Sequence, residues 1–308
     1  MLKRYFLPAS VICGFMALLQ FESCSTINPP ETIPCYGHID GIGVTSQYSL
    51  QGTASASVSC AWVYVDDQPV GAFEMPCTFP ILSGTGTHTV IVIPGVTADG
   101  AASTREKYPF YSYYDSAVTI TQGSITKFNF TAHYQSNVQF DWMEDFDGPS
   151  QYVTSLTRDN SGTDTNLIYK IGAPSAFEGL HSGQVLLDST KAIDANMVWE
   201  EYTDTVSLPY DGSPVFMELN YNTNTSFGVG IVPCTNGYDF YTNYGTQIGV
   251  YAMVLPSNGW QKIYIDLTSG LVNHFTKHFR FFFSMNRVPG QNARLWLDNI
   301  KILHTKGS

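Results

Sequence analysis

Ala61-Trp62-Val63-Tyr64-Val65 and Val70-Gly71-Ala72-Phe73 are two short runs rich in aromatic and β-branched residues, with Asp66-Asp67-Gln68-Pro69 between them. Residues of the first kind favour strands, whereas Asp and Pro favour turns. We therefore predict an antiparallel hairpin that turns within residues 66–69. The same alternation recurs at residues 78–82 and 87–93, which predicts two further strands on either side of a glycine-rich turn.

Short alternating runs, broken by Gly, Pro, Asn and Asp, continue through the rest of the chain. Almost no stretch has the periodicity of a long amphipathic helix, and this pattern is typical of sandwiches and jelly rolls. Aromatic residues make up 14% of the sequence and charged residues 13%, a balance that suits exported all-β proteins. We predict an all-β fold with two tandem β-sandwich domains, at residues 35–135 and 137–304.

The first predicted domain carries two sequence blocks in a characteristic order. Val63-Tyr64-Val65-Asp66-Asp67-Gln68-Pro69-Val70-Gly71 is the hairpin block. A strand-pair block follows, with Pro76-Cys77-Thr78-Phe79-Pro80-Ile81-Leu82 and then Gly86-Thr87-His88-Thr89-Val90. This order resembles the PEGA-type, immunoglobulin-like β-sandwich. The resemblance implies a module that is usually not catalytic.

The second predicted domain resembles the jelly rolls of carbohydrate-binding modules, a galactose-binding-like fold. Val138-Gln139-Phe140-Asp141-Trp142-Met143-Glu144-Asp145-Phe146-Asp147-Gly148 is similar to their first strand, and His181-Ser182-Gly183 to a turn. Leu297-Asp298-Asn299-Ile300-Lys301-Ile302 is similar to their last strand. Trp260-Gln261-Lys262-Ile263-Tyr264-Ile265-Asp266-Leu267 matches a further block. The resemblance implies a jelly roll that binds a ligand.

An apolar run at residues 5–21 follows Lys3 and Arg4 and ends near Ser23 and Cys24. This layout predicts a secretory signal at residues 1–23. The cysteine after Ser23 resembles that of bacterial lipoproteins, which implies cleavage before Cys24 and lipid on Cys24. A plain signal peptide and an uncleaved anchor are the alternatives. Residues 24–34 contain three prolines and predict an extended tether, and the rest of the chain is long enough for two domains.

The charge balance excludes two classes of partner. Asp and Glu number 26 and Lys and Arg 15, so the net charge is −11. Such a chain lacks the basic surface that nucleic acid needs, and charge does not attract it to anionic lipid. The lipoprotein resemblance implies a lipid-anchored outer-membrane protein of the Bacteroidota. The sequence does not indicate on which face of that membrane the protein lies.

Four cysteines stay after removal of the signal and lipidation of Cys24: Cys35, Cys60, Cys77 and Cys234. In an oxidising compartment they can form disulfides. The most local pair is Cys60 with Cys77, because both fall in the first domain around one strand pair. Four buried free thiols are the alternative.

Acidic residues of the first and last strands of the second domain form a candidate metal site. A jelly roll pairs these strands, so we expect Glu144, Asp147 and Asp298 to meet in space. Calcium takes six to eight oxygen ligands. The resemblance to carbohydrate-binding modules implies that Glu144 and Asp298 occupy the places of structural calcium ligands. The alternative is that these acids cap turns and bind no metal.

Aromatic rings are the sugar-binding groups that the resemblance implies. Residues 236–246, rich in Asn, Gly and Tyr, are the predicted binding surface, although such loops also contact proteins. Trp62, Trp142, Trp260 and Trp296 lie in strand patterns and are predicted to be core. The candidate ligand-binding residues are Trp199, Tyr202, Tyr238, Phe240, Tyr241 and Tyr244.

A loop at residues 94–111 combines three of the scarce charges, Arg105, Glu106 and Lys107, with Tyr108 and further aromatic residues. Tyr and Arg are favoured anchors in protein interfaces, which would make this loop a docking face. The alternative is that its aromatic rings cap the end of the first sandwich.

The sequence contains no G-x-S-x-G or H-E-x-x-H motif, and no pair of acids stands out as a glycosidase pair. We therefore predict a non-enzymatic, membrane-anchored lipoprotein whose β-sandwich modules bind a glycan or a partner protein. The alternatives are a structural accessory of a Bacteroidota secretion, gliding or other outer-membrane complex, and a glycan-active enzyme.

Overall fold

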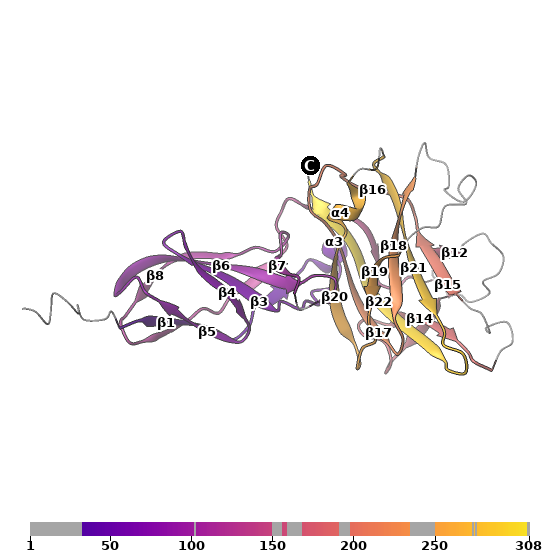
Figure 1. Cartoon of the computed structure of the whole chain (residues 1–308), viewed down its shortest axis with the longest axis horizontal. Coiled ribbons are helices and arrows are strands. Elements are labelled where there is room, and N and C mark those ends of the chain that lie inside the picture. The colour runs from indigo at the N-terminus through magenta and orange to yellow at the C-terminus, as the bar shows by residue number, and fades with distance from the viewer. Residues whose placement is uncertain are drawn as a thin grey trace, which may run out of the picture.

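The computed structural model describes residues 33–101, 103–149, 156–158, 168–190, 198–234, 250–272, 274 and 276–306, and for 156–158, 198–202 and 250 it describes the backbone. These residues form an elongated all-β molecule in which one end of an N-terminal sandwich lies against a face of a C-terminal sandwich (Figure 1). The predicted fold class is confirmed. Among the described residues, no helix has the length and apolar character needed to span a membrane.

The N-terminal sandwich is built from ten strands in the described residues: β1 Cys35–Ile39, β2 Gly43–Thr45, β3 Cys60–Val65, β4 Gln68–Glu74, β5 Cys77–Ile81, β6 Gly86–Thr97, β7 Arg105–Lys107, β8 Tyr114–Ile120, β9 Ile125–Lys127 and β10 Thr131–His133. One sheet has the order β5-β1-β9, and the other has the order β4-β3-β6-β7 with β8 also paired to β6. Strands β2 and β10 form a short parallel pair. A one-turn helix, α3, spans Tyr48–Gln51.

The predicted hairpin is formed by β3 and β4, and its turn consists of Asp66 and Asp67. Both residues have a positive φ, 49° and 61°, as a two-residue type I′ turn requires. The Asp66 carboxylate accepts a hydrogen bond from the backbone N–H of Thr89 at 3.0 Å and lies 2.6 Å from Nδ1 of His88. The turn is therefore held against β6 as well as by its own backbone.

The C-terminal sandwich contains β11 Val138–Glu144, β12 Leu156–Arg158, β13 Tyr169–Gly172, β14 His181–Leu187, β15 Val198–Thr203, β16 Val206–Ser207, β17 Val215–Thr223, β18 Phe227–Cys234, β19 Val250–Val254, β20 Gln261–Asp266, β21 His278–Asn286 and β22 Ala293–Thr305, with a helical turn, α4, at Thr268–Leu271. One sheet has the order β13-β14-β22-β17-β20, with β11 paired to β22. We call it the junction sheet. The facing sheet has the order β12-β15-β21-β18-β19, with β16 paired to β21.

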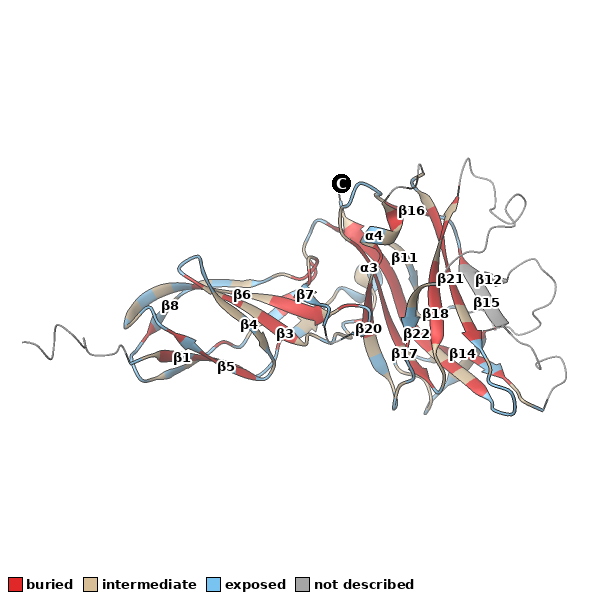
Figure 2. Ribbon diagram, viewed as in Figure 1, coloured by how far each residue is buried: buried red, intermediate tan, exposed pale blue. Residues whose placement is uncertain are grey.

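Alternation along the strands separates the core from the outer faces. On β17, Met217 and Leu219 point into the C-terminal core, where they pack with Phe281 and Phe283 of β21 and with other apolar residues. Figure 2 shows the buried stretches of strands from both sheets, including β17, β18, β21 and β22. On the opposite face of β17, Phe216 belongs to the core of the N-terminal sandwich. The junction sheet therefore has apolar contacts on both faces.

The four cysteines of the two domains are buried free thiols: Cys35, Cys60, Cys77 and Cys234. Cys60 and Cys77 form no disulfide because they point in different directions. Cys60 lies on β3 next to Ala61, which packs into the core, and alternation turns Cys60 to the outer face. Cys77 lies on β5 of the other sheet and packs into the core. The structure agrees with the alternative of free thiols.

Of the four tryptophans predicted for the core, Trp142 packs against the C-terminal core. The prediction is wrong for Trp62, Trp260 and Trp296, which are half-buried outside both cores. On β22 the reason is alternation, because Leu297 points inward and so turns Trp296 outward. The rings of Trp260 and Trp296 lie 6.1 Å apart between centroids on the outer face of the junction sheet.

The aromatic loop of the N-terminal sandwich packs onto the junction sheet. Tyr108 makes edge contacts with Phe216 of β17 at 5.3 Å and with Tyr264 of β20 at 4.9 Å between ring centroids. Phe216, Tyr264 and Leu303 all belong to the same apolar cluster as the N-terminal core. The loop therefore caps the end of its own sandwich and docks at the same time, and its docking partner is the second domain of the same chain.

Hydrogen bonds close the seam between the sandwiches. The Tyr264 hydroxyl accepts from the backbone N–H of Ser57 at 2.9 Å, and the Tyr264 carbonyl accepts from Asp99 N–H at 2.7 Å. The side-chain amide of Asn220 donates to Ser55 Oγ at 2.9 Å. Because these bonds add to a shared apolar cluster, the two sandwiches form one packed unit.

A buried ion pair lies at the centre of this seam. The Glu218 carboxylate of β17 is 3.0 Å from Lys262 Nζ of β20, and both side chains are at most 3% exposed. Glu218 also accepts hydrogen bonds from the hydroxyls of Tyr108 at 2.5 Å and Tyr134 at 2.8 Å. Two residues of the C-terminal sandwich thus carry the charges, and two tyrosines of the N-terminal sandwich complete the carboxylate's hydrogen bonds.

A third charge, Lys301 of β22, completes the cluster. Its Nζ donates to the Thr53 carbonyl at 2.6 Å and to the Tyr134 hydroxyl at 3.2 Å. Burial lowers the pKa of Lys301 to about 8, although the nearby Glu218 favours its charged form. Burial alone would raise the pKa of Glu218, but Lys262, Lys301 and the Tyr108 hydroxyl outweigh that effect and hold the pKa below its ordinary value. Glu218 is therefore ionised at neutral pH.

We expect Glu218→Gln to lower the free energy of unfolding by about 3–5 kcal/mol, because the change leaves two buried ammonium groups without their counter-charge. Urea unfolding followed by tryptophan fluorescence measures this loss. Glu74→Gln is the matched control, since Glu74 forms an exposed ion pair with Arg105, and its effect should stay below about 1 kcal/mol. Equal effects of the two changes would contradict a structural role for the buried cluster.

Candidate functional site

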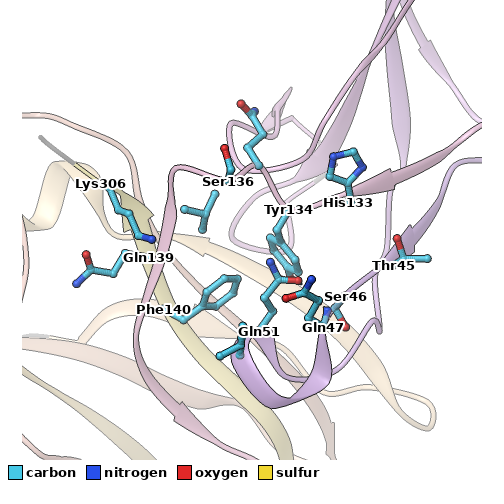
Figure 3. Close-up of a pocket in the computed structure, with 13 residues that line it drawn as sticks. Thr45, Ser46, Gln47, Gln51, His133, Tyr134, Ser136, Gln139, Phe140 and Lys306 are labelled. Atoms are coloured by element: carbon cyan, nitrogen blue, oxygen red, sulfur yellow. Dashed lines mark hydrogen bonds between the residues drawn. The ribbon is translucent and has the colours of Figure 1, made fainter.

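An open groove lies where the two sandwiches meet, beside the buried ion cluster. Its volume is about 770 Å³, which is within the range of small-molecule sites in proteins. The walls come from three separate parts of the chain: the β2–α3 region, the segment from β10 into β11, and the end of β22 (Figure 3). The lining residues are Thr45, Ser46, Gln47, Leu50, Gln51, His133, Tyr134, Gln135, Ser136, Val138, Gln139, Phe140 and Lys306.

The first wall is the single helical turn α3. The backbone N–H of Gln47 donates to Oε1 of Gln51 at 2.8 Å, and the Ser46 hydroxyl donates to the Gly52 carbonyl at 2.7 Å. Gly52 ends the turn with a φ of 65°, a conformation that favours glycine. Local hydrogen bonds therefore shape this wall and present the side chains of Gln47 and Gln51 in the groove.

The second wall begins at the end of β10. Ser112 holds this segment in place through its hydroxyl. The hydroxyl accepts a hydrogen bond from the His133 N–H at 3.0 Å and lies 3.1 Å from Nδ1 of His133. The Gln135 side-chain amide donates to the carbonyls of Pro109 at 2.9 Å and Tyr111 at 3.0 Å. Both N–H groups of that amide are thus used within the protein, which leaves its carbonyl oxygen as an acceptor for a ligand.

The inner side of the groove is aromatic. The rings of Tyr134 and Phe140 meet edge to face with their centroids 5.0 Å apart. Tyr134 is 3% exposed, and its hydroxyl contacts Glu218 and Lys301 of the buried cluster. The ion cluster that holds the two sandwiches together therefore also positions one side of the groove.

Amides and hydroxyls make up most of the polar groups in the groove, and none of its lining residues is Asp, Glu or Cys. Each glutamine side chain carries an acceptor oxygen and a donor NH₂ group, so the groove can both donate to and accept from hydroxyl groups. Lys306 adds an ammonium group, and its backbone N–H donates to the Asn137 carbonyl at 2.6 Å. This set suits the binding of a polyhydroxylated molecule and contains no carboxylate pair for glycoside hydrolysis.

The predicted calcium ligands lie outside this groove. Asp147 Oδ1 accepts from the backbone N–H groups of Leu180 at 2.8 Å and His181 at 2.7 Å. Glu144 Oε1 accepts from the Phe146 N–H at 2.6 Å. Both carboxylates therefore satisfy backbone donors of neighbouring loops.

Asp298, the third predicted ligand, is 1% exposed. Its Oδ2 accepts from the Ser182 hydroxyl at 2.6 Å and from the Glu178 N–H at 3.3 Å, and its Oδ1 accepts from the Asn299 N–H at 2.8 Å. Burial raises its pKa to about 7, although these hydrogen bonds act in the opposite direction. Asp298 thus holds the 173–180 loop to β22.

The calcium site expected at these three acids stays a prediction. Within the part of the chain that the structure describes, no group of three or more His, Cys, Asp and Glu side chains is arranged to hold a metal ion. Calcium needs at least six oxygens around one point, whereas Glu144, Asp147 and Asp298 direct their oxygens to separate N–H and O–H donors. In the structure these carboxylates accept hydrogen bonds from nearby turns.

The other predicted site residues lie outside the residues whose side chains are described. Trp199 and Tyr202 belong to β15, for which the backbone is described at these positions, and Cys24 precedes the first described residue. The remaining predicted ligand-binding residues also lie outside the described ranges: Tyr238, Phe240, Tyr241 and Tyr244. The binding surface predicted at residues 236–246 stays a prediction.

Sequence reasoning missed the groove. Its polar residues come from positions near 47, near 135 and at 306, and none belongs to a motif. The spacing Gln47-x-x-x-Gln51 is repeated at Gln135-x-x-x-Gln139, but the first pair lies on a helical turn and the second leads into a strand. No signal in the sequence therefore predicts that these amides meet.

No family model matches the chain, and no curated protein is similar to it in sequence. Similar solved structures include the xylan-binding domain from Paenibacillus barcinonensis Xyn10C, at 13% identity, covering 56% of this chain and 99% of that one with a TM-score of 0.36. The K3 cleaved adhesin domain of Lys-gingipain from Porphyromonas gingivalis is 15% identical and covers 54% of this chain and 98% of its own, also with a TM-score of 0.36.

A third similar structure, of carbohydrate-binding modules from the β-sandwich superfamily, is 12% identical and covers 80% of this chain and 85% of its own, with a TM-score of 0.33. Of these three structures, none exceeds 15% identity. What they bind is therefore a property of those proteins and is not carried over to this chain.

We expect the buried carboxyl of Asp298 to make stability depend on pH. Its pKa is about 7 in the folded protein and 3.8 in a model compound, so between about pH 4 and 7 the folded state binds more protons than the unfolded state. Stability contributed by this group therefore falls as pH rises through that window. In the wild type, this group should lower the free energy of unfolding as the pH rises from 4.5 to 7.5. In Asp298→Asn that decrease should be smaller by about 1–4 kcal/mol.

Urea unfolding at several pH values measures this dependence, and Asp115→Asn, on an exposed position of β8, controls for the loss of one carboxylate. If wild type and Asp298→Asn show parallel pH profiles, Asp298 does not carry the effect.

Proposed function

We propose that this chain is a non-enzymatic binding protein, held at the outer membrane by lipid on Cys24, and that the groove between its sandwiches binds a glycan. The observation that carries the proposal is the lining of the groove, which consists of glutamine amides, hydroxyls, one imidazole, one ammonium group and apolar side chains without a carboxylate.

Glycan hydroxyls both donate and accept hydrogen bonds, and this groove offers partners of both kinds. Gln135 has its donors occupied by backbone carbonyls and presents an acceptor. Gln51 has its oxygen occupied by the Gln47 N–H and presents a donor. Side chains that are already oriented in this way lose little conformational entropy when they bind, which supports specific recognition.

The arrangement supports binding rather than catalysis. A glycosidase needs two carboxyl groups on either side of the scissile bond, and the groove lining has none. Ser112 and His133 resemble a nucleophile–base pair, since Oγ lies 3.1 Å from Nδ1. The same hydroxyl accepts the His133 backbone N–H, and the Ser112 N–H donates to the His133 carbonyl. The contact therefore belongs to the antiparallel backbone pairing of residues 111–112 with residues 133–134.

The direction of the chain supports a role of the N-terminal sandwich as a spacer. Strand β6 begins at Gly86, which is paired with Ile120, and continues to Thr97, next to the bridge between Ala98 and Tyr264 at the junction. Its 12 residues span about 40 Å. Cys35 Sγ contacts the Gly84 carbonyl, so the chain enters at the end remote from the junction. The segment that follows Cys24 would thus join the domain at the end opposite the groove.

We expect Gln47→Ala and Gln51→Ala each to weaken glycan binding by about 3–10-fold, the effect of losing one neutral hydrogen bond. The measurement is a glycan array with residues 24–308, followed by calorimetric titration with the glycans that bind. Gln122→Ala, in the exposed turn before β9, is the matched control and should leave the affinity unchanged.

Absence of binding to every glycan on the array contradicts a glycan ligand and leaves a partner protein as the ligand class. Equal affinities of wild type, Gln47→Ala and Gln51→Ala for a bound glycan would place its site outside the groove.

We expect Cys24→Ser to release the protein from the membrane fraction, because the serine hydroxyl does not accept the lipid that holds the chain to the bilayer. Fractionation and intact-mass measurement of the mature protein provide the readout. Cys13→Ser is the control within the predicted signal and should leave the protein in the membrane fraction. Continued membrane association of Cys24→Ser, at the mass of an unlipidated chain, would refute the anchor.

A further inference from the structure

A second hollow adjoins the groove at the end of the C-terminal sandwich. Its volume is about 450 Å³. It is lined by the segment that follows β16, by Lys277 and His304, and by Gln139, which also lines the groove. Gln139 is exposed and lies on β11. The two hollows therefore share a wall residue.

The strand pairing shows how the two hollows are related. Gln139 of β11 is paired with His304 of β22, and Lys306 lies just beyond the end of β22. His304 lines the second hollow and Lys306 lines the groove. Gln139, His304 and Lys306 thus lie where the two hollows meet, and we call these three residues the ridge.

Hydrogen bonds hold this ridge in place. The Gln139 amide donates to Asp141 Oδ1 at 2.6 Å, and His304 Nε2 lies 3.0 Å from Asp141 Oδ2. The His304 Nδ1 lies 2.7 Å from the Thr305 carbonyl. Asp141 accepts one N–H of the Gln139 amide, which fixes the orientation of this side chain at the ridge.

The second hollow offers what the groove lacks, an exposed aromatic ring. Tyr210 is 46% exposed, whereas Tyr134 of the groove is 3% exposed. Pro209, next to Tyr210, has its own φ fixed by its ring, and Asp211 Oδ1 accepts from the Ser213 N–H at 3.0 Å. The loop that carries the ring is therefore ordered by its own contacts. A ring held in this way provides an apolar face on which the C–H face of a sugar ring can pack.

We propose that the groove and the second hollow form one continuous binding path, and that the ligand is an oligosaccharide chain which crosses the Gln139 ridge and packs a sugar ring on Tyr210. The inference rests on the proposed function, because it extends the same site. The groove binds one part of the chain through amides, and the hollow binds the next part through Tyr210 and the polar groups of Ser207 and Lys277.

The test is calorimetric titration with xylo-, cello- and β-1,4-galacto-oligosaccharides of two to six sugar units. We expect the affinity of at least one series to rise about 10-fold or more from the shortest to the longest member. Tyr210→Ala should remove this rise and leave the shortest bound member unaffected, whereas Gln47→Ala should weaken every member. Tyr169→Ala is the matched control, because Tyr169 is 49% exposed on β13.

The possible results separate this inference from the proposed function. Binding that is independent of chain length, or a length effect that persists in Tyr210→Ala, overturns the continuous path and leaves glycan binding in the groove intact. Absence of binding to all three series, together with an empty glycan array, overturns both.

Discussion

A buried carboxylate, Glu218, is the constraint on which the arrangement of this molecule depends. It lies on the outward face of the junction sheet, where an uncompensated charge would be strongly unfavourable. Lys262 and Lys301 compensate the charge from neighbouring strands, and Tyr108 and Tyr134 reach it from the other sandwich. The apolar contacts attract the two sandwiches to each other, and the charges and hydroxyls of the cluster are matched in the observed orientation.

The candidate site follows from that orientation. Tyr134 contacts Glu218 through its hydroxyl and lines the groove with its ring, so one residue belongs to both the seam and the site. The groove has walls from residues near 47, from residues 133–140 and from Lys306. It exists only when the two sandwiches are packed. A separate C-terminal sandwich would therefore lack one wall of the site and expose the aromatic face of the junction sheet.

Sequence reasoning succeeded where local physics decides the structure. The hairpin of β3 and β4 was predictable because Asp66 and Asp67 tolerate positive φ and because strand propensity is high on either side. It failed where the orientation of a side chain depends on tertiary contacts. Cys60 lies near Cys77 in sequence but points to the opposite face. Trp296 belongs to an alternating run, which shows that the strand has two faces but not which face points into the core. Hydrophobicity does not identify that face here, because the junction sheet packs against apolar residues on both sides.

The sequence by itself determined an all-β chain with two sandwiches, because alternation and turn residues act over short distances. It also determined an acidic molecule without the basic surface that nucleic acid requires. Only the tertiary structure decided which acids are buried partners and which amides form a groove. Asp298 anchors a loop that is distant in sequence, because N–H and O–H donors from that region reach its carboxylate. The groove's amides meet because three segments far apart in sequence are brought together at the seam, and no local pattern encodes such a meeting.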